Sequence, residues 1–154
     1  VVRTMPNMPA QIGEGMTALC KGKKATSRDM NVAQRILGCV GRTVVVDESL
    51  IDAVTAISGS GPAYIFFVVE CMLKAARSLG VSQNMAKELV YQTVTGSVHQ
   101  MRASAEEPAV LRERVTSKRG TTEAALKVFM KARTDTIFLN AMKAAKKRSR
   151  ELAK

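Results

Sequence analysis

A helical stretch that is apolar on every side is the feature that most constrains the fold of this chain. Pro62 suits the first position of a helix, because the N–H that proline lacks is not needed there. The residues that follow, 63–69, include no charged side chain. A helix that is hydrophobic all round has to be buried. In a chain of only 154 residues, such burial predicts that a second subunit covers this helix.

Helical signals continue from residue 49 to the end of the chain. Capping residues, glycine stops and hydrophobic spacing delimit the segments, and residues 49–52 are similar to a capping box. The predicted helices span residues 49–57, 62–79, 82–101 and 108–115, with two more that begin near 123 and 134. Helices joined by such short connections predict an α-helical bundle domain over residues 49–154.

The first 48 residues have a different pattern. Residues 1–5, 15–20 and 42–46 are short, apolar or β-branched runs that predict strands. Thr26 or Ser27 can cap a helix between the second and third runs, and Gly41 ends it. Three strands are too few for a self-sufficient sheet. We therefore predict a mainly α fold, in which a small α/β remnant over residues 1–48 precedes the helical bundle.

Composition limits which cellular compartment and which kinds of site are expected. The three cysteines form no C-x-x-C pair, and His99 is the only histidine, so neither a disulfide framework nor a metal site is expected. This cysteine usage fits a reducing compartment. There is no run of eighteen apolar residues and no charged-then-apolar leader. We expect a soluble, cytoplasmic protein without membrane contact, and a chain that is part of something longer.

The net charge of +11 invites a nucleic-acid interpretation. The excess lies mostly on the last predicted helix, at Lys143, Lys146, Lys147, Arg148, Arg150 and Lys154. With no Trp, two Tyr and four Phe, there is little aromatic surface on which bases could stack. A solvated face or the rim of an oligomer interface is favoured, and binding to a polyanion is the alternative.

Residues 116–122 are the best candidate for chemistry. They precede a predicted helix, whose first N–H groups have no internal partners and attract a carboxylate or phosphate. Gly120 would let the backbone approach a ligand closely, and Lys118 and Arg119 add positive charge. Hydroxyl groups come from Ser117, Thr121 and Thr122. In the simpler alternative, one of the two threonines merely caps the helix.

Five motifs occur along the chain in a characteristic order. Residues 3–10 read RTMPNMPA, residues 13–17 read GEGMT, residues 52–64 read DAVTAISGSGPAY, residues 92–96 read QTVTG and residues 148–152 read RSREL. In order and spacing, these motifs resemble those of the pyrroline-5-carboxylate reductases. The resemblance extends over essentially the whole chain, including the loop at residues 116–122.

This resemblance implies a fold and an activity. In that family an N-terminal Rossmann-type domain binds NADPH or NADH, and a helical C-terminal domain interlocks with its twin into a homodimer, often within a larger ring. Residues 1–48 would be the end of the Rossmann-type domain, and residues 49–154 the dimerisation and substrate-binding domain. The implied reaction, a step of proline biosynthesis, is hydride transfer from NAD(P)H to the C=N bond of 1-pyrroline-5-carboxylate.

The resemblance also implies which residues form the site. The substrate carboxylate would be held by the loop residues Ser117, Gly120, Thr121 and Thr122. Thr122 would act in catalysis, because its hydroxyl would hydrogen-bond the ring nitrogen of the imine. Glu48 and Thr55 would lie near the nicotinamide end of the pocket.

Two departures from the family pattern bear on activity. The family usually has Pro-Gly where this chain has Lys118-Arg119, and an arginine is not expected to adopt every backbone angle that glycine allows. The glycine-rich turn that binds the pyrophosphate of a dinucleotide does not occur in this sequence. We therefore expect this chain alone to be inactive. A non-catalytic helical assembly module and a basic polyanion-binding protein are the alternative interpretations.

Overall fold

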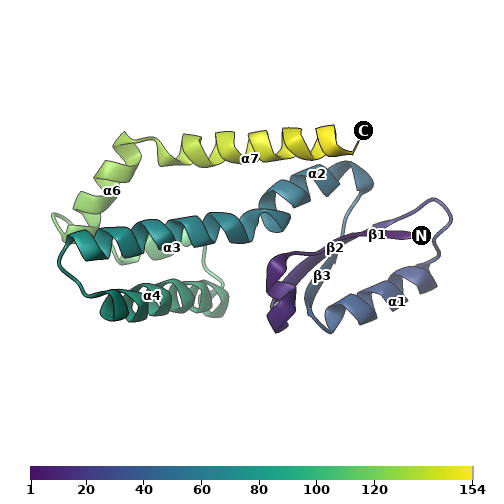
Figure 1. Cartoon of the computed structure of the whole chain (residues 1–154), viewed down its shortest axis with the longest axis horizontal. Helices are drawn as coiled ribbons and strands as arrows, with labels where there is room; N and C mark the ends of the chain where they lie inside the picture. The colour runs from purple at the N-terminus through teal and green to yellow at the C-terminus, as the bar shows by residue number, and fades with distance from the viewer. Residues whose placement is uncertain (154) are drawn as a thin grey trace. The chain divides into compact units, whose positions relative to one another are not determined.

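The computed structural model describes residues 1–153, which divide into two compact units. The first unit contains residues 1–65 and the chain from residue 138 onward, and the second contains residues 66–137. Figure 1 labels the elements along the chain. The predicted fold class is confirmed, because the structure is mainly helical with one small three-stranded sheet. The domain boundary at residue 48 stays a prediction.

The sheet belongs to the first unit. Its strands are β1 (Val2–Met5), β2 (Gly15–Lys21) and β3 (Gly41–Val45), in the order β1-β2-β3. β1 pairs with β2 in antiparallel register, and β2 pairs with β3 in parallel register. The parallel pair is joined through helix α1 (Ser27–Gly38), as a parallel connection requires. Each of these elements lies within about two residues of its predicted range.

The central strand β2 forms most of the core of this unit. Thr17, Ala18, Leu19 and Cys20 are each at most 2% exposed. Burial raises the pKa of the Cys20 thiol, so this thiol stays neutral and inert within the sheet. The short 3₁₀ helix η1 (Met8–Ile12) connects β1 to β2.

Helix α1 begins with a complete capping box. Thr26 Oγ1 accepts a hydrogen bond from the Asp29 N–H at 3.2 Å, and Asp29 Oδ2 accepts one from the Thr26 N–H at 2.7 Å. These reciprocal bonds satisfy N–H groups that the helix itself leaves without partners. The backbone N–H and the hydroxyl of Thr26 hold the pKa of the Asp29 carboxyl below its ordinary value.

We expect Thr26→Ala to lower the free energy of unfolding by about 1 kcal/mol, the usual cost of losing a threonine N-cap. The Asp29 carboxyl has a lower pKa in the folded chain than in the unfolded chain. Its stabilisation is therefore present above the unfolded pKa and is lost as the pH falls through the folded pKa. Urea unfolding at pH 7 and at acidic pH measures both effects. A stability difference between variant and parent that grows in acid would contradict this account.

A continuous helical stretch follows the sheet. It contains the 3₁₀ turn η2 (Glu48–Leu50), helix α2 (Ile51–Val54), the π-helical turn η3 (Thr55–Gly59) and helix α3 (Gly61–Ser78). Ile51 joins Ala18 and Cys20 in a buried cluster. The predicted capping box at residues 49–52 is wrong, because no side chain caps η2 or α2. Asp52 instead accepts a hydrogen bond from Ser149 Oγ at 2.7 Å.

The last helix, α7 (Thr134–Leu152), is thereby tied to α2 within the first unit. Arg150 Nε lies 3.5 Å from Asp52 Oδ2, next to the Ser149 hydrogen bond. One carboxylate thus contacts two residues of the basic C-terminal helix. Of the other cations of that helix, Arg148 lies 3.0 Å from Glu151, and Lys143 and Lys147 are exposed.

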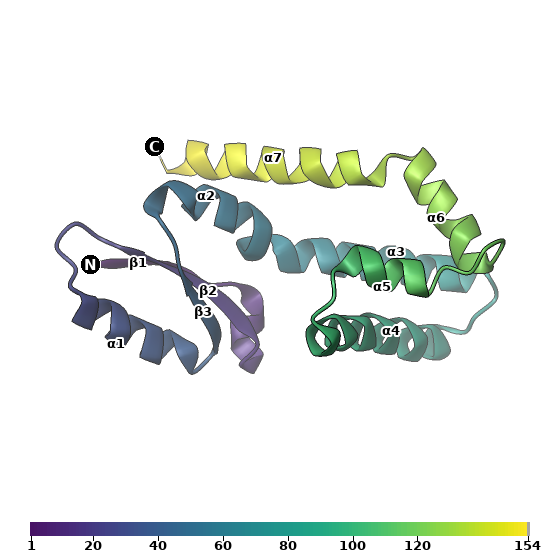
Figure 2. The same cartoon turned by 180° about the vertical axis from the view of Figure 1, so that it is seen from behind.

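The second unit is entirely helical. It comprises most of α3 together with α4 (Gln83–Ser104), α5 (Pro108–Arg114) and α6 (Thr121–Lys131). Figure 2 shows α4 and α5 side by side, and a hollow of ≈ 740 Å³ is lined by residues of both helices. In the described chain only Ala86 and Val90 of this unit are buried. The unit therefore has almost no core of its own.

The apolar turns of α3 are exposed in the single chain. Ile65, Phe66 and Phe67 have exposed fractions of 53%, 56% and 64%. By length and composition alone, the stretch Glu48–Ser78 is the one described helix that could cross a membrane, and 6% of its most apolar part is buried. Two glycines and a π-helical turn interrupt this stretch. Its exposed apolar surface also has the character of a helix that packs against another protein.

Candidate functional site

The predicted anion-binding loop connects α5 to α6 in the second unit. It closes through a hydrogen bond from the Gly120 N–H to the Ser117 carbonyl at 3.0 Å. Gly120 is the N-cap of α6, with extended backbone angles and no side-chain cap. The alternative in which Thr121 or Thr122 caps the helix is therefore wrong. The two threonines are instead the first two residues of α6, whose N–H groups have no partner within a helix.

Gly120 fits closely against Ser117. A Cβ atom at this position would clash with Ser117 Oγ and would lie 3.0 Å from the Ser117 carbonyl oxygen. The loop therefore folds tightly over Ser117 just before the helix begins. This turn brings the hydroxyl group of Ser117 to the start of α6, where Thr121 and Thr122 also lie.

Arg119 has a left-handed backbone conformation, with φ of 63°. Glu123, in the first turn of α6, accepts a hydrogen bond from the Arg119 N–H. Lys127 Nζ lies 2.8 Å from the other carboxylate oxygen of Glu123. The hydrogen bond from Lys127, and then that from the Arg119 backbone, hold the pKa of the Glu123 carboxyl below its ordinary value. Arg119 therefore adopts a backbone angle that favours glycine, and the hydrogen bond from its N–H to Glu123 stabilises that angle.

The charge of the loop favours an anion. Lys118 and Arg119 are both exposed, and the positive end of the α6 dipole adds to their field. Thr121 is exposed and Thr122 is partly buried. Backbone N–H groups, hydroxyls and cations gathered at one helix start can bind a carboxylate by charge-assisted hydrogen bonds.

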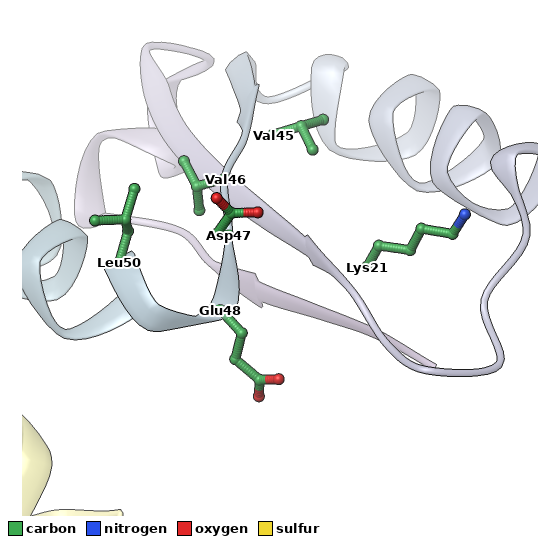
Figure 3. Close-up of a pocket in the computed structure, with 6 residues that line it drawn as sticks. All are labelled: Lys21, Val45, Val46, Asp47, Glu48 and Leu50. Carbon is green, nitrogen blue, oxygen red and sulfur yellow. The ribbon is translucent and has the colours of Figure 1, made fainter.

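Glu48 and Thr55, which are predicted to lie near the nicotinamide end of the pocket, belong to the first unit. Glu48 lies in η2 and forms an exposed ion pair with Arg3, with Nη1 and Oε1 3.2 Å apart. It borders a hollow of ≈ 350 Å³ at the end of β3, whose lining residues are drawn in Figure 3. This hollow is lined by Lys21, Val45, Val46, Asp47, Glu48 and Leu50. Exposed carboxylates at the end of a strand are accessible to a ligand.

Thr55 begins the π-helical turn η3. Its hydroxyl donates a hydrogen bond to the Ile51 carbonyl at 2.8 Å, and its own carbonyl accepts one from the Ser60 N–H at 2.8 Å. The hydroxyl proton is thus used within the helix, and the oxygen lone pairs remain able to accept a hydrogen bond. Single π-helical turns occur frequently at functional sites. The sequence pattern predicts a break at the glycines and gives no sign of this wider turn.

Asn7 is a residue of this region that the sequence analysis does not single out. Its side-chain N–H donates to the Ser58 carbonyl at 3.0 Å, and its Oδ1 accepts a hydrogen bond from the Met16 N–H at 2.9 Å. Asn7 thereby ties the π-helical turn to the start of β2. The neighbouring Gly59 packs against the end of the Met5 side chain, with which a Cβ at this position would clash. In the sequence, the only sign of this role is that Asn7 lies between Pro6 and Pro9.

The chain fits only part of a dinucleotide. Within residues 1–153, the connection from β2 to α1 lacks the glycine pattern that binds a pyrophosphate at a helix start. The contact of Glu48 and Thr55 with one end of such a molecule stays a prediction. Residues 1–153 contain no group of three or more His, Cys, Asp or Glu side chains that could hold a metal ion.

Comparison with known proteins identifies the fold and the family. The model of the family "Pyrroline-5-carboxylate reductase dimerisation" matches residues 48–152. The pyrroline-5-carboxylate reductase of Pseudomonas aeruginosa is 43% identical over 154 residues, which are 99% of this chain and 56% of that protein. The protein of the same name from Synechocystis sp. is 38% identical, over 100% of this chain and 58% of the relative.

Comparison with solved structures leads to the same family. A Plasmodium falciparum pyrroline carboxylate reductase with NADP bound has a TM-score of 0.95 at 32% identity, covering 99% of this chain and 63% of that one. A pyrroline-5-carboxylate reductase from Coxiella burnetii has a TM-score of 0.94 at 38% identity, with 99% and 57% covered. The chain spans little more than half the length of the curated relatives it matches. The resemblance read from the motifs is confirmed, and the chain belongs to the pyrroline-5-carboxylate reductase family.

Proposed function

We propose that this chain supplies the substrate loop and the dimer interface of a pyrroline-5-carboxylate reductase of proline biosynthesis. The loop between α5 and α6 carries this proposal. It combines the N–H groups at the start of α6 with three hydroxyl groups, two cations and a glycine packed closely against Ser117. The names of the relatives support the assignment.

The proposed substrate, 1-pyrroline-5-carboxylate, has a carboxylate and an imine on one small ring. The carboxylate would accept hydrogen bonds from the first N–H groups of α6 and from the hydroxyls of Ser117 and Thr121. Gly120 brings the backbone close enough for these bonds. Lys118 and Arg119 would raise the local concentration of the anion. The chain thereby orients the ring by its charged group.

Thr122 would hold the reacting end of the substrate. It lies one residue farther into α6 than Thr121, and its hydroxyl would hydrogen-bond the ring nitrogen. NADPH or NADH, when bound, supplies the hydride that adds to the imine carbon. The nitrogen takes up a proton as the C=N bond becomes a single bond, so the product is the secondary amine of proline. The role of Thr122 is to fix the orientation of the nitrogen and to assist this protonation.

The cofactor would be held mostly outside this chain. The P. falciparum relative was solved with NADP bound, but residues 1–153 offer no turn for the pyrophosphate. Glu48 and Thr55 would contact the nicotinamide end. The chain alone would therefore bind a dinucleotide poorly and would be inactive.

The dimer follows from the exposed apolar surface. The second unit buries only Ala86 and Val90 in the described chain, whereas Phe66 and Phe67 of α3 are more than half exposed. The family match over residues 48–152 is to a dimerisation domain. We propose a homodimer in which a second copy covers α3, and further assembly into a ring. A cytoplasmic protein without membrane contact fits this proposal, since the partner accounts for the apolar helix.

A fusion tests the proposed activity. The N-terminal portion of the P. aeruginosa relative, up to the residue that matches Val1, is joined to this chain. We expect the fusion to oxidise NADPH in the presence of 1-pyrroline-5-carboxylate, and the 154-residue chain alone to do so not at all. The intact relative serves as the positive control.

A folded fusion without activity, even after Lys118-Arg119 is changed to Pro-Gly, would contradict the proposed reaction. The chain would then be a non-catalytic assembly module. A steep loss of nucleic-acid binding with added salt would instead favour the polyanion alternative.

A further inference from the structure

Arg119 occupies a backbone conformation that an arginine adopts only at a cost. Its φ of 63° lies in the left-handed region, where the Cβ of an L-residue approaches the following carbonyl oxygen. The Gly120 N–H donates a hydrogen bond to the Ser117 carbonyl, which closes the turn around Arg119. A contact from α6 to the Arg119 backbone would favour this turn.

Glu123 provides that interaction. One oxygen of its carboxylate accepts the N–H of Arg119, and the other lies 2.8 Å from Lys127 Nζ, one turn farther along α6. The Glu123 side chain is 29% exposed and that of Lys127 is 71% exposed. The carboxylate is thus held between the helix and the loop. Its lowered pKa is consistent with these two partners.

We infer that Glu123 is a positioning residue, whose carboxylate fixes the backbone of residues 117–120 and so orients the groups that receive the substrate carboxylate. This inference rests on the proposed function of the loop. Glu123 itself does not touch the substrate in this account. Lys127 orients the carboxylate, and Arg119 is the residue through which Glu123 acts.

The role differs from a general effect of negative charge at a helix start. Such a charge stabilises any helix through its dipole. Asp135 occupies the first turn of α7 and provides the matched case. Asp135→Ala removes the same kind of charge without a contact to the loop. A positioning role requires that Glu123 act on the Arg119 amide specifically.

Amide hydrogen exchange of the 154-residue chain, measured by NMR, tests the contact without any assay of activity. Glu123→Ala should accelerate exchange of the Arg119 amide about tenfold, because a hydrogen bond to a charged acceptor is lost. Glu123→Gln keeps an acceptor oxygen and should retain most of the protection. Asp135→Ala should leave the Arg119 amide unchanged. Equal exchange in the parent chain and in Glu123→Ala would overturn the inference.

Kinetics of the fusion protein test the consequence for the reaction. Glu123→Ala should lower kcat/KM about tenfold or more, since a displacement of about 1 Å at a site is costly, and Glu123→Gln should restore most of it. With Arg119→Gly the turn needs no support, so the same Glu123→Ala change should have a clearly smaller effect. An equal loss in both backgrounds, or no loss in either, would overturn the positioning role. A folded parent fusion that stays inactive even with Lys118-Arg119 changed to Pro-Gly would reject the proposed function, while the exchange experiment would still decide the contact.

Discussion

Replacing Phe67 with glutamate is expected to dissociate the proposed dimer of this chain and to remove most of its helical structure at micromolar concentration. Phe67 is 64% exposed on α3, beside Phe66 at 56%. Burying one such side chain in a partner contributes roughly 1.5–3 kcal/mol. In a symmetric dimer each substitution counts twice. A carboxylate in the same place would have to be buried without a partner, which costs several kcal/mol more.

The loss of structure follows because the second unit has almost no core. Its described residues bury only Ala86 and Val90, too few to offset the conformational entropy of four ordered helices. Sedimentation velocity and circular dichroism at several protein concentrations measure both effects. Val32→Glu is the control, because Val32 is 49% exposed on α1, outside the helical unit. A Phe67→Glu chain that stays dimeric and helical would contradict the assignment of this face.

Replacing Thr122 with valine should lower kcat/KM of the fusion about 100-fold or more, the usual effect of removing one hydrogen-bond donor that acts in a transition state. Valine keeps the shape of threonine and removes only the hydroxyl. Thr122 lies within α6 and does not cap it, so the helix itself should remain intact. Steady-state kinetics with varied 1-pyrroline-5-carboxylate separate the effect on kcat from that on KM.

Thr122→Ser is the matched variant, because it keeps the hydroxyl and removes the methyl group. It should retain most of the activity. Thr121→Val should mainly raise KM, since Thr121 is assigned to the carboxylate and not to the reacting nitrogen. A fall of less than about threefold for Thr122→Val would mean that this hydroxyl makes no contact with the imine.

The regular elements were predictable because their signals are local. The capping residue Thr26 and the stop near Gly41 lie beside the ends of α1, and Pro62 lies beside the start of α3. Each of these signals depends only on a few neighbouring residues, so it can be recognised in the sequence.

Features that depend on distant contacts could not be predicted. The π-helical turn is tied to the start of β2 through Asn7, which is 51 residues away from its partner Ser58. Asp52 was expected in a capping box, but it contacts Ser149, 97 residues later. The hydrogen bond between Glu123 and the Arg119 N–H spans four residues, yet it depends on a backbone angle that arginine seldom adopts. In each case the spatial partner decides the role of the residue.

The molar mass of the unaltered chain in solution is the most direct test of the central claim that its apolar helices form a dimer interface. Sedimentation equilibrium should give twice the chain mass of 16.7 kDa, or a multiple of that dimer, and the helical structure should melt at a temperature that rises with protein concentration. A 16.7 kDa species that keeps its helical structure at every concentration would contradict the account. The exposed surface of α3 would then need an explanation other than a second copy of this chain.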